Sequence, residues 1–131
     1  MKMLLMTYIK TKKMKILLRL EYLFLLIIGL FAYAQTGISW WWFIGLFFVP
    51  DLSMLGYLVS PKIGAFTYNL FHHFGTAVIC FLLGNFLGIR FLEVAGVILF
   101  SHSAFDRFFG YGLKFSDSFH HTHLGKIGKE S

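Results

Sequence analysis

Residues 38–59 read ISWWWFIGLFFVPDLSMLGYLV, and the only charged side chain among them is that of Asp51. A helix needs about 20 mostly apolar residues to cross the hydrocarbon core of a bilayer. This stretch is long enough, and it opens with three consecutive tryptophans, at 40–42. Tryptophan is enriched where a membrane helix meets the water interface. The stretch therefore predicts a membrane-spanning segment that starts at one face of the bilayer.

The composition of the whole chain indicates the same class of protein. Of its 131 residues, 57% are hydrophobic and 14% are charged, whereas an ordinary soluble domain has about 25% charged residues. A soluble domain of this size must cover a large surface with polar groups. The composition therefore argues against a cytosolic globular enzyme, a disordered chain and a nucleic-acid-binding domain. We expect the lipid bilayer to be a partner and nucleic acid not to be one.

Three further apolar stretches lie at about 20–34, 63–84 and 91–109. Short polar links separate the four stretches, and short links place consecutive helices antiparallel and side by side. The prediction is an all-α integral membrane protein built as a four-helix bundle. Its parts are a basic cytoplasmic segment (1–19), the four-span domain (20–109) and a polar, histidine-containing cytoplasmic tail (110–131).

The basic residues predict the orientation of the chain. With a cytoplasmic N-terminus, 11 of the 12 lysines and arginines fall on the cytoplasmic side, and Arg90 alone falls outside. Cytoplasmic loops carry such an excess of basic residues. We therefore expect both termini in the cytoplasm, a multi-pass protein of the inner membrane, and attraction to anionic lipid headgroups. The eleven are Lys2, Lys10, Lys12, Lys13, Lys15, Arg19, Lys62, Arg107, Lys114, Lys126 and Lys129.

Alternatives are open at the N-terminus. The sequence Ala-Tyr-Ala at 32–34 resembles a cleavage site, so the first apolar stretch could be a signal peptide. Met14 could be the true start in place of Met1. The sequence predicts no particular oligomeric state.

Ionisable residues interrupt three of the predicted spans at one common depth. At 1.5 Å per residue, Asp51, His72 and His102 lie roughly 12, 13 and 10 Å from the cytoplasmic ends of their helices. Asp106 follows His102 by four residues and shares its helix face. A charged group inside a bilayer costs at least about 2.5–3.5 kcal/mol, so such groups usually have a partner or a function. Their convergence is the main functional signal in the sequence.

These two carboxylates and two imidazoles are a suitable ligand set for Zn²⁺, Fe²⁺ or Mn²⁺. A bound cation would neutralise Asp51 and Asp106 and account for their burial. The same residues could instead form a structural hydrogen-bond network or a path for protons or ions. In the tail, three histidines fall within four residues. One of them, His123, could complete a metal site at the cytoplasmic mouth.

Five short motifs, taken in order, carry a resemblance to a known family. They are PDLSMLGY (50–57), YNxxH (68–72), HxxFDR (102–107), GYGLK (110–114) and THLG (122–125). Over roughly residues 21–129 the chain resembles the small bacterial integral membrane proteins that share domain of unknown function 4260 (DUF4260). The resemblance implies a membrane protein without an assigned activity. It also implies that five residues belong to the family pattern, namely Asp51, His72, His102, Asp106 and His123.

A weaker similarity runs to membrane-bound metal-dependent hydrolases, which pair a Pro-Asp step with a later His-Ser step. The corresponding steps here are at 50–51 and 102–103, and the chain lacks the His-Arg dipeptide associated with that group. This similarity implies a metal-dependent membrane hydrolase. The alternative is a non-enzymatic membrane protein whose buried Asp/His network is structural or conducts protons or ions.

For the hydrolase, we expect cleavage of a lipid-borne ester or phosphate by a metal-activated water molecule. Asp51, His102 and Asp106 are the expected catalytic residues, with one carboxylate available as a base. Arg107 and Lys114 lie where an anionic substrate headgroup would bind.

Overall fold

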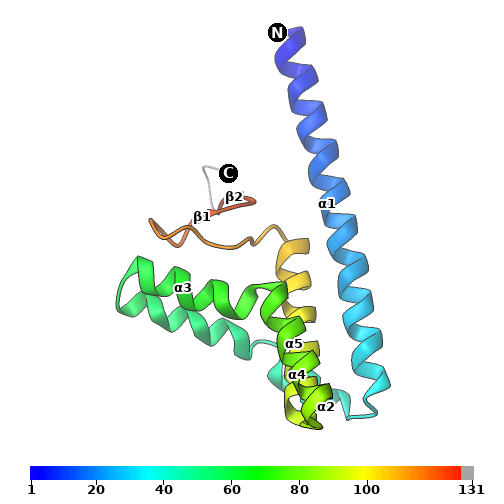
Figure 1. Ribbon diagram of the computed structural model, residues 1–131. Helices are drawn as coiled ribbons and strands as arrows, with labels where there is room; N and C mark the ends of the chain where they lie inside the picture. The colour runs from blue at the N-terminus through cyan, green and yellow to red at the C-terminus, as the bar shows by residue number, and fades with distance from the viewer. Residues whose placement is uncertain (128–131) are drawn as a thin grey trace.

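A computed structural model describes residues 1–127 of the chain (Figure 1). Residues 128–131 of the predicted tail, Lys129 among them, lie outside the described residues. The elements are α1 (Lys2–Gln35), α2 (Trp40–Leu46), the 3-10 helix η1 (Val49–Leu58), α3 (Pro61–His72), α4 (Phe74–Leu87), α5 (Arg90–Phe108), β1 (His121–Thr122) and β2 (Gly125–Lys126).

The helices are arranged as an upright group with a sideways hairpin. In Figure 1, α1 runs upright beside α5, and α4 lies along α5, which packs against both helices. By contrast, η1 and α3 pack against each other and extend sideways from the upright group. The start of α1 and the β1–β2 hairpin lie at the same end of the molecule.

The structure confirms apolar helices fit for a membrane, but not four straight spans. Two segments are long and apolar enough to cross a bilayer, Lys2–Gln35 and Trp40–Leu58. The helices α3 and α4 meet at a bend of 50°, and together they are a third candidate span if they cross the bilayer as one segment. The helix at the fourth predicted span, α5, does not qualify, because it carries charged residues near both of its ends.

Two of the predicted spans are broken, and each break has a local cause. Within 38–59, α2 cannot continue through Pro50, because proline lacks the N–H donor and clashes with the preceding turn. Proline is tolerated in the first turn of a helix, and Pro50 lies in the first turn of η1. Within 63–84, His73 is extended (φ −89°, ψ 129°), and its Nδ1 accepts the backbone N–H of Gly75 at 2.9 Å. His73 therefore ends α3 and caps α4.

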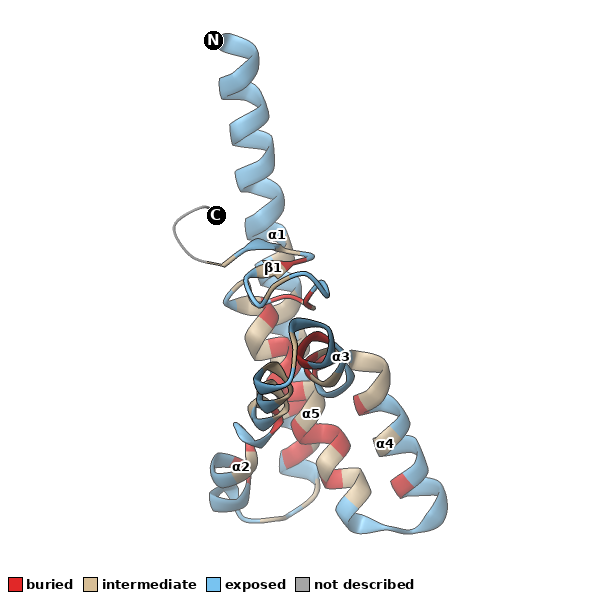
Figure 2. Ribbon diagram, turned by 90° about the vertical axis from the view of Figure 1, so that its left-hand side faces the viewer, coloured by how far each residue is buried: buried red, intermediate tan, exposed pale blue. Residues whose placement is uncertain are grey.

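The first helix includes the predicted basic segment. Its 34 residues correspond to a length of about 51 Å, which exceeds the roughly 30 Å of the hydrocarbon core. Residues 1–17 are exposed on all sides, as the pale blue part of α1 in Figure 2 shows. The basic segment is thus a helical extension of the first apolar stretch.

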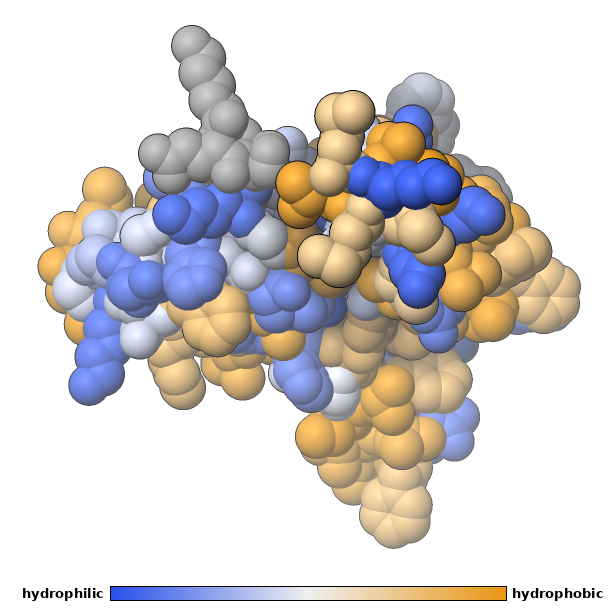
Figure 3. Space-filling model, turned by 90° about the horizontal axis from the view of Figure 1, so that it is seen from above, coloured by the Kyte–Doolittle hydropathy of each residue, from blue (hydrophilic) through white to orange (hydrophobic). Residues whose placement is uncertain are grey.

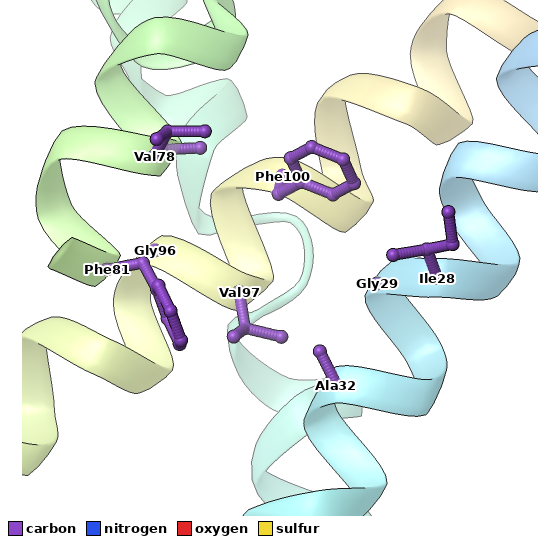
Figure 4. A pocket seen from close by; sticks show the side chains of 9 residues that line it. Ile28, Gly29, Ala32, Val78, Phe81, Gly96, Val97 and Phe100 are labelled. Carbon is purple, nitrogen blue, oxygen red and sulfur yellow. The ribbon is translucent and has the colours of Figure 1, made fainter. Parts of the chain in front are cut away.

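The core lies around α5, which holds nine of the buried residues, more than any other element (Figure 2). Close approach of α4 to α5 depends on Gly96, because a Cβ there would lie 2.5 Å from the backbone nitrogen of Phe81. An apolar cavity of about 160 Å³ remains among α1, α4 and α5, and Ile28, Val97 and Phe100 line it (Figure 4). Its lining holds no polar side chain, so we regard it as a packing gap.

The tail folds back over the helices instead of extending away. The Asn69 side chain of α3 accepts the backbone N–H of Lys114 and donates to its carbonyl oxygen, both at 2.7 Å. The rings of Tyr57 and Phe119 meet edge to face at 5.3 Å. These contacts fix the chain between α5 and the β-hairpin on α3 and η1.

Candidate metal centre

Three elements bring four ionisable side chains to one point. Asp51 lies in the first turn of η1, His72 in the last turn of α3, and His102 and Asp106 one turn apart on α5. Each offers one nitrogen or oxygen atom, and these four atoms all lie within 4.8 Å of one another. The predicted convergence of these residues is therefore confirmed.

The separations inside this cluster are short and nearly equal. The Nε2 atoms of His72 and His102 lie 3.1 Å apart, and Asp51 Oδ1 lies 3.2 Å from each of them. Asp106 Oδ2 lies 3.4 Å from His72 Nε2 and 3.5 Å from His102 Nε2. The two imidazoles thus share both carboxylates.

A neighbouring tyrosine orients the His72 ring and the Asp106 carboxylate. The Nδ1–H of His72 donates to the backbone carbonyl of Tyr68 at 2.8 Å. In the neutral imidazole this bond leaves the lone pair on Nε2, which faces the cluster. The Tyr68 hydroxyl donates to Asp106 Oδ2 at 3.2 Å, and its ring stacks on His72 with centroids 3.8 Å apart.

Aromatic packing holds the second imidazole. His102 is fully buried, and the rings of Phe47 and Phe48 contact it edge on, with centroids at 5.2 and 6.2 Å. Its Nδ1 has no hydrogen-bond partner within residues 1–127, so packing orients this ring. The side chain of Asp51 is 31% exposed, whereas that of Asp106 is 13% exposed. The cluster is therefore most open at Asp51.

Comparison with known families identifies the chain at family level. The family model described as Domain of unknown function (DUF4260) matches residues 15–127. The chain belongs to the DUF4260 family. No curated protein and no solved structure matches it significantly. The matched region contains all four residues of the cluster.

The fifth predicted ligand of this DUF4260 protein, His123, is not in the cluster. Its Nδ1 accepts the backbone N–H of Leu113 at 2.8 Å, and its Nε2 lies 3.3 Å from Nη1 of Arg107. Burial and the Arg107 guanidinium lower the pKa of His123. The structure thus places His123 beside Arg107 rather than with the four converging side chains.

The two predicted headgroup residues of this DUF4260 member lie in different surroundings. Arg107 is buried and donates from Nη2 to the carbonyl oxygen of His72 at 3.0 Å. Lys114 is also buried, and its Nζ donates to the Phe119 carbonyl at 2.9 Å and lies over the Phe119 ring. Arg107 lines a cavity of about 510 Å³, whereas Lys114 is enclosed by the folded tail.

Sequence reasoning missed two positioning residues in this DUF4260 site. Tyr68 precedes His72 by four residues, so helical spacing could have placed it beside that imidazole. Asn69 belongs to the same YNxxH motif, but its partner Lys114 is 45 positions away. No local pattern in the sequence signals a contact over that distance.

Proposed function

We propose that this DUF4260 protein is a multi-pass membrane protein with both termini on the cytoplasmic side of the inner membrane. Its four membrane segments would be α1, α2 with η1, α3 with α4, and α5. Large apolar side chains on their outer faces support this, because exposed apolar surface of this kind fits lipid. Arg90 donates to the carbonyl oxygen of Thr36 at the C-terminal end of α1, so it lies opposite the start of that helix, in agreement with the predicted charge asymmetry.

The two broken segments support a functional site at bilayer depth. Irregular backbone in a membrane is tolerated where protein or a water-filled cavity surrounds it. The breaks before η1 and at His73 lie next to cluster residues in the chain, Asp51 and His72 respectively. The bends thereby carry a carboxylate and an imidazole from two segments to α5.

We propose that the cluster binds one divalent metal ion, and its internal distances carry this proposal. Four ligands at about 2.1 Å from a tetrahedral zinc ion stand about 3.4 Å from one another. Five of the six separations here are 3.1–3.5 Å, and the sixth, between the two carboxylates, is at most 4.8 Å. The donor set of two imidazoles and two carboxylates suits Zn²⁺, Fe²⁺ or Mn²⁺.

We further propose that the site hydrolyses a lipid-borne ester or phosphate. A divalent metal would supply Lewis acidity and lower the pKa of a bound water molecule. The water oxygen would add to the carbonyl carbon or phosphorus, the ester bond would break, and the proton would pass to the departing oxygen. Asp51 is the more exposed carboxylate, so it would yield the fourth ligand position to water and take and return that proton, while His72, His102 and Asp106 would hold the ion.

A proton-conducting or structural network is the second candidate, because the same distances also suit hydrogen bonds. An imidazolium between the two carboxylates would satisfy the contacts of Asp51 Oδ1 and Asp106 Oδ2. This network would need no metal. Metal content and Asp51-dependent proton flux in proteoliposomes therefore separate the two candidates.

The hydrolase is tested with the purified protein in lipid nanodiscs, loaded in turn with Zn²⁺, Fe²⁺ and Mn²⁺. Mass spectrometry follows products from phosphatidylcholine, phosphatidic acid and a lipid monophosphate. We expect product with at least one metal, its loss on chelation, and a loss of about 100-fold or more in Asp51→Asn. Asp117→Asn is the matched control, because Asp117 is exposed in the tail. A metal-loaded protein that releases no product from these lipids contradicts the hydrolase.

A further inference from the structure

A second, polar cavity lies between α1 and the folded tail. Its volume is about 510 Å³, and none of the four cluster residues lines it. The cavity lies where the basic segment of α1 passes the turn after α5. The lining residues used below are Lys15, Arg19, Tyr22, Arg107, His123 and Lys126.

The charges around this cavity are all of one sign. Lysine and arginine side chains reach it from α1, α5 and the tail, and the described lining includes no aspartate or glutamate. Seen from above in Figure 3, hydrophilic side chains also gather on this end of the molecule, around the tail and the start of α1. Such a concentration of positive charge favours an anionic ligand.

The guanidinium of Arg107 gives the cavity a buried cation. Arg107 is 6% exposed, and it makes no ion pair with a carboxylate in the described part of the chain. Its neighbours are the His72 carbonyl, His123 Nε2, the Tyr22 side chain and the face of the Phe74 ring, 5.4 Å from the guanidinium carbon. The Asp106 carboxylate offsets part of this buried charge without forming a direct ion pair, and an anion in the cavity would offset more of the cost.

The backbone of the tail lets a second guanidinium approach. Gly110 has φ +91°, a conformation that favours glycine. The Nη2 atom of Arg19 lies 3.9 Å from the position of a Cβ at Gly110. The turn after α5 thus lies against the Arg19 side chain of α1, which brings two arginines from different elements to one cavity.

We propose that this cavity binds a phosphate group. Two guanidiniums and the nearby lysines can donate hydrogen bonds to several oxygens of one phosphate. Arginine binds phosphate through two parallel N–H donors. Basic pockets between membrane helices on the cytoplasmic side bind phospholipid headgroups, and a soluble phosphate would offer the same oxygens. A lipid source rests on the proposed membrane orientation, whereas the site itself depends neither on the metal nor on hydrolysis.

The test measures binding by the intact protein in detergent. Native mass spectrometry titrates phosphatidic acid, with phosphatidylcholine as the neutral comparison, and thermal unfolding is followed with inorganic phosphate. The test variant is Lys15→Gln with Arg19→Gln, because both side chains are exposed on α1 and line the cavity. The matched control is Lys10→Gln with Lys12→Gln, which removes the same charge from exposed positions of α1 outside the cavity lining.

We expect the test variant to weaken phosphatidic acid binding about tenfold or more, because it removes two cationic hydrogen-bond donors from the cavity. The control should change the affinity less than about twofold. Stabilisation by inorganic phosphate, lost in the test variant, would assign the site to a soluble phosphate. Equal losses in the two variants, or no binding of either probe by the wild type, would overturn the proposal. The metal content of each variant is measured in parallel. Failure of the proposed metal site is thereby distinguished from failure of the proposed phosphate site.

Discussion

The Nε2 atoms of His72 and His102 lie 3.1 Å apart, although the residues are 30 positions apart in the sequence. Asp51 Oδ1 lies 3.2 Å from both nitrogens. Two imidazole lone pairs repel each other at this distance unless a proton or a cation lies between them. The hydrogen bond from His72 Nδ1 to the Tyr68 carbonyl directs the His72 lone pair inward, which favours the cation.

Removal of the Tyr68 hydroxyl should weaken metal binding without unfolding the protein. This hydroxyl donates to Asp106 Oδ2 at 3.2 Å, while the ring stacks on His72. Tyr68→Phe keeps the ring, so the cluster loses one orienting bond. We expect metal affinity to fall about tenfold or more, measured by competition with a chromogenic chelator. Tyr8→Phe on exposed α1 is the control, and equal affinities in the two variants would contradict this role of Tyr68.

Gly96→Ala should separate α4 from α5. A Cβ at this position would lie 2.5 Å from the Phe81 nitrogen and 2.7 Å from the Ala77 carbonyl oxygen, so backbone has to move. We expect a loss of about 1–3 kcal/mol in the free energy of unfolding, measured by denaturant titration in detergent. Gly45→Ala on α2 meets no atom within 4 Å, and it should leave stability unchanged or raise it. Similar losses at both glycines would contradict the close helix contact.

Lys114 should titrate well below an ordinary lysine. Burial lowers its pKa from 10.5 to about 8, although the negative charges of Asp106 and Asp51 act in the opposite direction. Between these two pH values the unfolded chain binds the proton that the folded chain has released, so stability should rise with pH across this window. The measurement is ¹³C-lysine NMR in micelles, with Lys114→Gln to assign the signal and to abolish the rise. A pKa near 10.5 would contradict the burial of Lys114 in the tail.

Hydropathy and helical spacing predicted much of the site and less of the fold. The apolar stretches and the common depth of Asp51, His72 and His102 follow from counting residues along helices, so the cluster was predictable. Pro50, which cannot continue a helix, signals the break before η1. The break at His73 has no such signal, because histidine is not among the residue types that favour an N-cap.

Contacts over long sequence distances explain the remaining differences. The position of the tail depends on the pairing of Asn69 with the Lys114 backbone, which no local pattern encodes. His123 was a predicted ligand from its place in the family pattern. Its contact with Arg107 is also one that no local pattern encodes. Charge distribution predicted the basic end of the molecule, but only the folded tail shows that Arg19 and Arg107 line one cavity.

The most direct test of the metal centre is the metal content of the purified protein by plasma mass spectrometry, before and after incubation with Zn²⁺, Fe²⁺ or Mn²⁺. We predict about one ion per chain in the wild type and its loss in His102→Gln and Asp51→Asn, with circular dichroism showing both variants folded. His120→Gln and Asp117→Asn, at exposed tail positions outside the cluster, should keep the ion. A folded wild type that binds none of these metals, or folded His102→Gln that retains the ion, would contradict the metal centre.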